Sequence, residues 1–339
     1  MLRALDLFSG IGGITYGLRG IVAPTAYVEK DPNAREFLQK KHPGIPVFDD
    51  VCTFDATSLK GNIDIITAGW PCTGFSTAGK GTGFSHEASG LFTEVVRLAK
   101  ECEPKYLFLE NSFILSKIDN LKVIIKSFDD FGYDCRWLTC RATNVGALHQ
   151  RHRWFCLVSK RGLSDDVEIP HVDRFGWDNN QPHKQISKNT PENAQIARWL
   201  GNAVVPDQVR FAFTTLIHMD TTTLTEMTRN TKVGFSKNGI LYHCLIKMTE
   251  RPPLNIILHQ GELPEVHNAT TPVLERVIKK YWATPVFTQI PRGSTVLTSR
   301  CAKALGTQVR FCEKGVPGWY INCDWVTWLM GYPSDYFKV

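Results

Sequence analysis

The first 160 residues alternate short apolar segments with segments of helical periodicity, and this alternation limits the folds open to the chain. The segments with the length and composition of strands are residues 2–8, 25–28, 63–68, 106–109 and 154–158. The segments with helical spacing among them are residues 14–19, 33–41, 91–101 and 121–131. Strands that alternate with helices favour a sheet covered by helices on both faces. We therefore expect an α/β fold with a doubly wound, mostly parallel sheet.

A glycine-rich loop, Ser9-Gly10-Ile11-Gly12-Gly13, interrupts the chain after the first strand. Glycines there let the backbone approach a bound nucleotide and leave a helix N-terminus facing it, although a plain turn is the alternative. Glu29, at the end of the second strand, can accept hydrogen bonds from both hydroxyls of a ribose. The glycines at 10, 12, 13 and 17 do not match the dinucleotide pattern G-x-G-x-x-G. This spacing disfavours an NAD-dependent oxidoreductase and favours a single nucleoside, such as S-adenosylmethionine.

A lone cysteine, Cys72, lies in a Gly/Pro-rich loop, Ala68-Gly-Trp-Pro-Cys-Thr-Gly-Phe-Ser76, at the end of the strand over 63–68. The next apolar strand ends in a carboxylate, at Glu110-Asn111. A thiol and a carboxylate on neighbouring strand ends are a plausible pair of nucleophile and acid. The alternatives are that Cys72 is a buried structural thiol and that Glu110 caps the following turn.

Two arginines, Arg151 and Arg153, alternate just before the strand over 154–158. Alternation puts both guanidinium groups on one side of an extended chain, where they can bind a carboxylate, a phosphate or a base oxygen. An exposed basic edge is the alternative.

The composition is that of a globular protein: 339 residues, of which 43% are hydrophobic and 21% charged, are enough for two domains. No apolar run approaches about 18 residues, so we expect no transmembrane helix. A strand follows Met1 almost at once and leaves no room for a signal peptide, so we expect an intracellular protein. The 10 cysteines include no C-x-x-C pair, which argues against zinc and predicts reduced thiols and no metal site.

Positive charge is concentrated in the last third of the chain. Residues 1–220 carry 25 Lys and Arg against 25 Asp and Glu, whereas residues 221–339 carry 14 against 8. The net charge of +6 therefore lies in the C-terminal part, which suits contact with a polyanion, although a basic solvated surface is the alternative. A Thr-rich segment after residue 220 predicts a boundary between a domain over 1–220 and a domain over 221–339.

The region around this boundary has recognisable elements. Residues 162–193, rich in Asp, Asn, Pro, Gln and His, predict a loop or linker inside the first domain. Residues 194–200 and 206–219 have the pattern of helices. The second domain is predicted to be β-rich, with apolar segments at 240–248, 255–259, 295–298 and 318–322.

Five segments in order resemble the motifs of the cytosine-5 DNA methyltransferase family. They are Asp6–Gly13, Gly69–Ser76, Glu110-Asn111, Arg151-His152-Arg153 and Gly201–Pro206. The family more often continues the Glu-Asn pair with Val, where this chain has Ser112. The DNA-reading domain of the family usually lies between the last two of these motifs, but only residues 154–200 separate them here.

Two later segments, Trp282–Pro285 and Trp325–Pro333, resemble segments that phage-type members place before the final motif. The resemblance therefore implies a permuted order, with target recognition in 221–339. The alternative is that 282–333 is ordinary core of an unrelated appended domain.

By resemblance, the fold is that of an S-adenosylmethionine-dependent methyltransferase with a smaller β-rich C-terminal domain. The activity implied is methylation of cytosine C5 in double-stranded DNA, on a base flipped out of the helix. Cys72 is the implied nucleophile, Glu110 holds or protonates N3, Arg153 contacts O2 and holds Glu110, and Arg151 meets phosphate or the catalytic loop. The residues implied in the cofactor pocket are Phe8, Gly10, Gly12, Glu29, Asp50, Leu91, Asn202 and Val204.

Within that pocket, Phe8 is expected to stack on adenine and Asp50 to accept from its amino group, with Asp49 as the competitor and a loop-end cap as the alternative for Asp50. We expect a monomer in the cytoplasm of a prokaryote or an infected host cell, or in the nucleus of a eukaryote. A cytosine-5 methyltransferase acting on transfer RNA has the same catalytic motifs and is the nearest alternative. A non-catalytic DNA-binding relative is another, and the intact Cys72, Glu110 and Arg153 argue against it.

Overall fold

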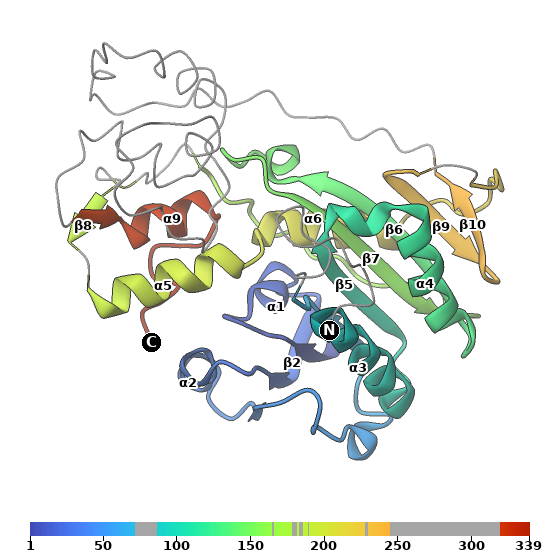
Figure 1. Cartoon of the computed structure of the whole chain (residues 1–339), viewed down its shortest axis with the longest axis horizontal. Helices are drawn as coiled ribbons and strands as arrows, with labels where there is room; N and C mark the ends of the chain where they lie inside the picture. The colour runs from blue at the N-terminus through green and yellow to red at the C-terminus, as the bar shows by residue number, and fades with distance from the viewer. Residues whose placement is uncertain are drawn as a thin grey trace, which may run out of the picture. The chain divides into compact units, whose positions relative to one another are not determined.

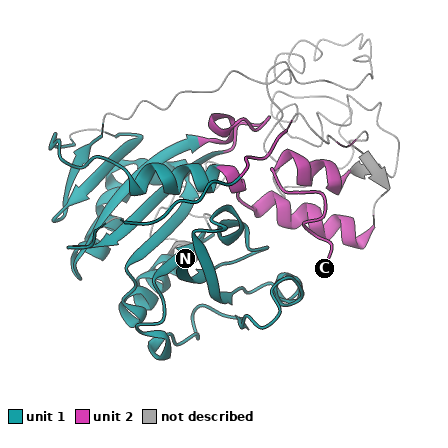
Figure 2. Ribbon diagram, turned by 180° about the vertical axis from the view of Figure 1, so that it is seen from behind, with its two compact units in different colours: residues 1–140, 152–172, 208–248 teal, residues 141–151, 173–207, 249–339 magenta. Residues whose placement is uncertain are grey.

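The structure, a computed structural model, describes residues 1–71, 87–164, 166–177, 182, 186–188, 190–227, 230–244 and 319–339. The chain divides into two compact units, shown in two colours in Figure 2. The first comprises residues 1–140, 152–172 and 208–248, and the second comprises residues 141–151, 173–207 and 249–339.

The first unit is built on a sheet whose described strands run in the order β10-β9-β6-β7-β5-β4-β1-β2-β3 (Figure 1). Their bounds are β1 Leu2–Leu7, β2 Val22–Val28, β3 Val47–Phe48, β4 Ile65–Ala68, β5 Tyr106–Ser112, β6 Tyr133–Arg141, β7 His152–Lys160, β9 Val233–Lys237 and β10 Ile240–His243. Strands β3, β2, β1, β4 and β5 pair in parallel, whereas β5–β7, β6–β9 and β9–β10 are antiparallel. The predicted doubly wound, mostly parallel sheet is confirmed.

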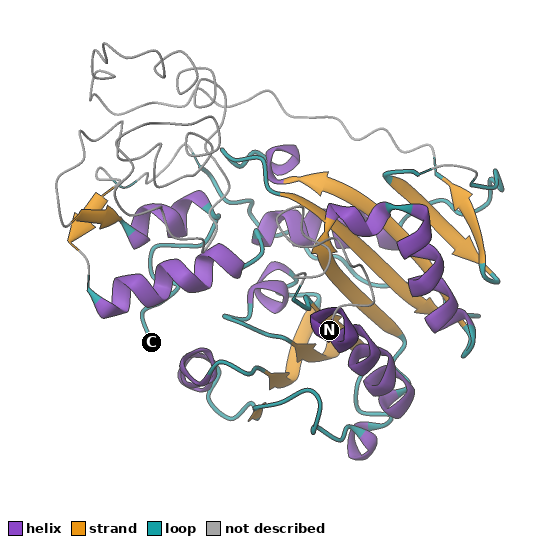
Figure 3. Cartoon of the chain, in the orientation of Figure 1, coloured by secondary structure: helices purple, strands orange, loops and turns teal. Residues whose placement is uncertain are grey.

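Helices cover both faces of this sheet (Figure 3). They are α1 Gly13–Gly17, α2 Pro32–Lys41, α3 Glu87–Cys102, α4 Ile118–Asp129 and α6 Pro206–Ile217, with short 3-10 helices at Thr57–Leu59 and Phe113–Ser116. A further 3-10 helix, Ala142–Val145, belongs to the second unit. Leu107 and Leu109 of β5 join the core cluster that contains the apolar residues of α3 and α4. Phe108 points to the opposite face because side chains alternate along a strand, and there it meets Phe213 of α6 edge to face at 5.5 Å.

Strand β6 was not among the sequence predictions. Residues 134–140 are buried almost throughout, so the segment lacks the alternation of a half-exposed strand. Its neighbour β9 approaches closely at Gly234: a Cβ there would lie 2.6 Å from the ring of Trp137 and 2.6 Å from the carbonyl oxygen of Tyr242. Glycine is therefore required for β9 to pair with β6.

Strands β9 and β10 extend the sheet of the first unit beyond residue 220. The amides of Met227 and His243 bond across to the carbonyls of Leu241 and Thr225, so the segment before β9 covers part of the outer side of β10. Covering an edge strand in this way protects its unpaired backbone groups. The domain boundary at 220 stays a prediction, but the first compact unit does not end there.

The second unit contains α5 Pro191–Asn202, α9 Cys323–Leu329 and an antiparallel pair of short strands, β8 Ile186–Lys188 and β11 Trp319–Ile321. Thr190 caps α5 by accepting a hydrogen bond from the amide of Asn193. The ring of Trp199 on α5 stacks against Phe337 near the C-terminus. The C-terminal residues thus pack on the helix that ends in the Gly201-Asn202 motif.

These bounds refine the sequence predictions. The expected linker over 162–193 contains strand β8, and the helix expected at 194–200 begins at Pro191. The strand expected within 318–322 is confirmed as β11, and the strand expected within 240–248 is β10. The strands expected at 255–259 and 295–298, and the segment 282–285, lie outside the described residues. No helix in the described part of the chain is both long and apolar enough to cross a membrane.

Candidate active site

The ends of β1, β4 and β5 bring the predicted site residues of the first unit to one edge of the sheet. Parallel strands end at the same edge, and in open α/β sheets this carboxyl edge is where ligands bind. The glycine loop follows β1, residues 69–71 follow β4, and Glu110-Asn111 forms the end of β5.

Glu110 and Arg153 form an ion pair at this edge. Arg153 Nε lies 2.9 Å from Glu110 Oε1, and the two side chains are 24% and 10% exposed. The pair forms because β5 and β7 are antiparallel and the register sets Arg153 opposite Ser112, two residues beyond Glu110. Arg153 also donates from Nη1 to the carbonyl of His152 at 2.9 Å. The structure therefore joins the carboxylate and the guanidinium that the sequence analysis placed together.

The segment that leads to Cys72 is fastened to the same strand end. Asn111 Nδ2 donates to the backbone carbonyl of Trp70 at 3.0 Å. A Cβ added at Gly69 would lie 3.2 Å from Glu110 Oε2, so the backbone of the loop runs close beside the carboxylate. Cys72 itself, with residues 73–86, lies outside the described residues. The anchoring role of Asn111 was missed from sequence, although its place beside Glu110 in the motif was the available signal.

The glycine loop is tied to Glu29 at the end of β2. The amide of Gly10 donates to Glu29 Oε2 at 2.6 Å, and the amide of Asp31 donates to Oε1 at 2.8 Å. Phe8, Gly10 and Gly12 have φ values of 55°, 53° and 75°, which lie in the left-handed region. The two glycines adopt this conformation without strain. A Cβ at Gly10 would meet nothing within 4 Å. Each carboxylate oxygen has two lone pairs, so both oxygens of Glu29 can accept further hydrogen bonds.

A buried acid, Asp6, lies beneath this loop and was not singled out as a site residue. Asp6 is 1% exposed and accepts a hydrogen bond from the hydroxyl of Thr67 at 2.6 Å. Burial raises the pKa of Asp6 to about 8, with a further increase from the charge of Glu29, while the hydroxyls of Thr67 and Thr15 lower it. Asp6 therefore carries its proton at neutral pH. An acid inside an otherwise apolar strand was the sequence signal.

Asp50 and Leu91, also predicted for the cofactor pocket, belong to the first unit as well. Asp50 accepts from the amide of Cys52 at 2.9 Å, and this bond is the main cause of its lowered pKa. Lys30 Nζ lies 3.4 Å from Asp50 Oδ2. The loop-end cap that was the alternative for Asp50 is thus present, and Oδ2 pairs with the exposed Lys30. Leu91 on α3 packs against the core cluster while remaining partly exposed.

Arg151, Asn202 and Val204 belong to the second unit. Arg151 is 3% exposed, and its guanidinium donates to the carbonyls of Gly201 and Asn202 at 3.4 Å each. The hydroxyl of Tyr332 donates to the carbonyl of Val204 at 2.9 Å. The structure thus joins the first arginine of the Arg-His-Arg motif to the Gly-Asn motif, and contact of Arg151 with phosphate stays a prediction.

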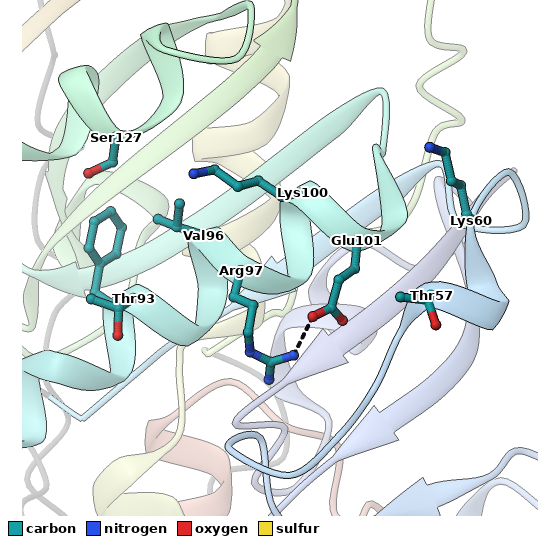
Figure 4. A pocket seen from close by; sticks show the side chains of 9 residues that line it. Thr57, Lys60, Thr93, Val96, Arg97, Lys100, Glu101 and Ser127 are labelled. Carbon is teal, nitrogen blue, oxygen red and sulfur yellow. Dashed lines mark hydrogen bonds and ion pairs between the residues drawn. The ribbon is translucent and has the colours of Figure 1, made fainter.

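A cleft of about 690 Å³ lies along α3, away from these residues (Figure 4). It is lined by Thr57, Lys60, Phe92, Thr93, Val96, Arg97, Lys100, Glu101 and Ser127. Its cations have partners within the chain: Lys60 pairs with Glu103 at 2.7 Å, and Lys100 lies over the ring of Phe131. No predicted cofactor residue lines this cleft, so it is not the site expected from sequence.

The mostly parallel sheet, with the predicted site residues of the first unit at its carboxyl edge, has the architecture of an α/β enzyme. Residues 2–289 match the family model described as C-5 cytosine-specific DNA methylase. The chain belongs to this family, and it catalyses methylation of DNA cytosine at C5. The family is one of DNA methylases, which favours DNA over the transfer-RNA alternative.

The chain is similar to two known methyltransferases in sequence and to one solved structure. The chain is 44% identical over 356 residues to the type II methyltransferase M.CviJI of Paramecium bursaria Chlorella virus IL3A, covering 98% of this chain and 97% of that protein. It is 36% identical over 173 residues to the type II methyltransferase M.MspI of Moraxella sp, covering 50% and 41%. Among solved structures, the Dnmt2 methyltransferase of S. pombe is similar with a TM-score of 0.42, 19% identity, and coverage of 56% and 62%.

Proposed function

We propose that the methyl donor is S-adenosylmethionine and that it binds at the glycine loop of the first unit. The residues present fit such a group: the space beside Gly10 is open, and Glu29 is held by two backbone amides with lone pairs left for ribose hydroxyls. Phe8 and Asp50 would contact the adenine, and Gly12, Leu91, Asn202 and Val204 would complete the pocket. When bound, the sulfonium supplies an electrophilic methyl group.

Cys72 is the proposed nucleophile. Cytosine C5 is a poor nucleophile until a thiolate adds to C6, after which C5 is electron-rich and able to take a methyl group. Loss of the C5 proton to a base then re-forms the ring double bond and expels Cys72 as the thiolate. The position of Gly69 beside Glu110 supports this role, because it brings the chain leading to Cys72 to the carboxylate.

Glu110 and Arg153 are proposed to act on the base. Glu110 would hold or protonate N3, so that the electron pair displaced by the thiolate is accepted by the ring. Arg153 would contact O2 and keep the carboxylate oriented, as their 2.9 Å ion pair supports. A base cannot reach such a site inside a duplex, so the cytosine must be flipped out of double-stranded DNA. Arg151, held on the Gly201-Asn202 carbonyls, would meet phosphate or the catalytic loop.

Target recognition is proposed to lie in residues 221–339, after the last catalytic motif. The excess of positive charge in that segment supports contact with DNA phosphates. The relatives named as type II methyltransferases support a role beside a restriction enzyme, inside a bacterial or virus-infected cell. A monomer suffices, because one chain carries every motif that the reaction requires.

The Glu110–Arg153 pair beside Gly69 carries this proposal, and one experiment tests it. DNA from cells that express the chain should contain 5-methylcytosine at a defined sequence on bisulfite sequencing, and DNA from cells that express Cys72→Ala should not. Methylation found in transfer RNA but not in DNA would contradict the proposed substrate.

A further inference from the structure

Arg97, in the middle of α3, binds the backbone of the loop that follows Asp50. Its Nη2 donates to the carbonyl of Val51 at 2.8 Å, and its Nη1 donates to the carbonyl of Phe54 at 3.1 Å. These two carbonyls belong to the turn that begins at Asp50, whose own carbonyl accepts from the amide of Phe54 at 3.0 Å. A single side chain on α3 thus holds both ends of the turn.

Two carboxylates on the same helix orient the guanidinium. Arg97 Nε lies 2.7 Å from Glu94 Oε2, and Nη1 lies 2.6 Å from Glu101 Oε1; Figure 4 shows the contact with Glu101. Glu94 and Glu101 are one turn before and one turn after Arg97, the spacing at which helical side chains meet. The other oxygen of Glu101 accepts from the amide of Ala56 at 2.9 Å. The helix therefore fixes the 51–56 loop at three backbone positions.

This arrangement requires arginine rather than any cation. The guanidinium offers five donors in a rigid plane and here serves two carboxylates and two carbonyls together. An ammonium group at the end of a lysine chain cannot reach four acceptors in that geometry. The side chains of Val51, Phe54 and Ala56, which belong to this loop, are buried. A shift of the turn would therefore also disturb the packing of these side chains.

The same helix carries Leu91, less than two turns before Arg97. Asp50 and Leu91 are the two residues that follow β3 in the first unit and are expected to contribute to the cofactor pocket. α3 presents one of them directly and holds the loop bearing the other through Arg97.

We propose that Arg97, oriented by Glu94 and Glu101, is a positioning residue for the cofactor: it fixes Asp50 relative to α3 and so sets the adenine end of the pocket. The inference rests on the proposed function, in which Asp50 meets the adenine. Arg97 itself touches no substrate. Its loss acts on cofactor affinity through the 50–56 loop and leaves the chemistry of Glu110 and Arg153 unchanged.

The test measures binding of S-adenosylhomocysteine by calorimetry to the full chain. Arg97→Ala should weaken binding about tenfold or more, because charge-assisted hydrogen bonds to the loop are lost. Amide hydrogen exchange in residues 51–56 should rise at the same time. The rate of methyl transfer at saturating cofactor should stay within about threefold of wild type. Lys100→Ala is the matched control, since Lys100 lies on the same helix and in the same cleft but contacts none of these carbonyls.

Two further variants test whether Arg97 affects cofactor binding through Asp50. In an Asp50→Ala background, Arg97→Ala should add little further loss if it acts through Asp50. Glu101→Gln keeps an acceptor for the amide of Ala56 but removes the charge beside Arg97, and it should give a smaller loss in the same direction. Glu101→Gln replaces Arg97→Ala in the binding measurement if Arg97→Ala does not fold.

The outcomes separate the inference from the proposed function. Unchanged S-adenosylhomocysteine affinity in Arg97→Ala, or in Glu101→Gln if only that variant folds, overturns the positioning role. Equal losses in the single and Asp50→Ala backgrounds overturn the route through Asp50. If Glu29→Ala and Asp50→Ala also bind S-adenosylhomocysteine as tightly as wild type, the proposed pocket itself is wrong.

Discussion

Asn111 donates its side-chain amide to the backbone carbonyl of Trp70 at 3.0 Å, two residues before Cys72. Its neighbour Glu110 pairs with Arg153 on the other side of the strand end. Alternation along β5 therefore gives adjacent residues different contacts: the side chain of Glu110 pairs with Arg153, and the side chain of Asn111 holds the segment that leads to Cys72, the proposed nucleophile.

Asn111→Asp should slow methyl transfer while leaving cofactor affinity unchanged. The substitution replaces a donor with a carboxylate that faces the Trp70 carbonyl, so the loop loses its anchor and a misplaced nucleophile costs about tenfold or more in rate. Single-turnover kinetics with saturating DNA and cofactor measure the effect. Asn120→Asp is the control, because Asn120 also donates to a carbonyl, that of Ile114 at 3.0 Å, away from the predicted site residues. Equal rates for the two variants would remove Asn111 from the site.

Glu110→Gln should slow chemistry more than binding. The amide can still hydrogen-bond to the base, but it cannot supply a proton or the charge that pairs with Arg153, a loss on the order of 10²-fold. Rates and DNA dissociation constants measured on the same preparation separate the two effects. A rate within about threefold of wild type would reduce Glu110 to a structural cap.

Cys72→Ala should abolish methyl transfer and leave S-adenosylhomocysteine binding nearly intact, because the thiol acts on the base. DNA with 5-fluorocytosine at the target should remain covalently attached to the wild-type protein in the presence of cofactor, since fluorine cannot leave as a cation. Denaturing gels detect the adduct. Residual turnover above about 1% in Cys72→Ala, or no adduct with wild type, would falsify the nucleophile assignment.

Asp6 should make the free energy of unfolding fall as pH rises, whereas most acidic residues make it rise. The unfolded chain releases this proton near pH 4, whereas burial holds it in the folded protein up to a pKa of about 8. Between these values the folded state binds the extra proton, so wild-type stability falls as pH rises and levels off above the folded pKa. Asp6→Asn lacks the titration and keeps an oxygen for the Thr67 hydroxyl.

Urea unfolding of the two proteins at pH 5.5, 7 and 8.5 measures this difference. The stability of Asp6→Asn relative to wild type should rise with pH, by about 1.4 kcal/mol per pH unit where the folded state alone is protonated. A stability difference that does not change with pH would show that Asp6 is ionised in the folded protein.

The sequence predicted the parallel part of the sheet and the residues at its carboxyl edge, because strand ends and glycine turns are local patterns. It did not predict β6, which is buried on both faces and so has no alternation, or the pairing of β9 with β6, which depends on the fit between Gly234 and Trp137. The Arg97 contacts could not be predicted either, because they too depend on the tertiary structure. They join residues more than forty positions apart, and an arginine at helical spacing from two glutamates reads as a solvated helix face.

The last prediction concerns target recognition. Residues 245–318 contain 10 Lys and Arg against 5 Asp and Glu, most of the excess charge of the chain. A truncation after Met219 is a poor test, because it removes β9 and β10 from the sheet and the C-terminal residues that pack on α5. Replacing 245–318 with a flexible Gly/Ser linker of about 20 residues retains the residues that make both sets of contacts and removes the most basic part of the proposed reader.

This internal deletion should bind S-adenosylhomocysteine as wild type does and lose sequence-specific DNA binding. The affinity of the full chain for DNA should fall steeply with salt, since phosphate contacts release counterions, and the deletion should have a shallower slope because it lacks those lysines and arginines. Filter binding across a salt series measures both slopes. Replacing an equal number of basic residues on the exposed surface of 1–220 is the control for charge alone. A deletion variant that still methylates the same sequence would place recognition outside residues 245–318, and with it the target-reading role would move out of the most basic part of the chain.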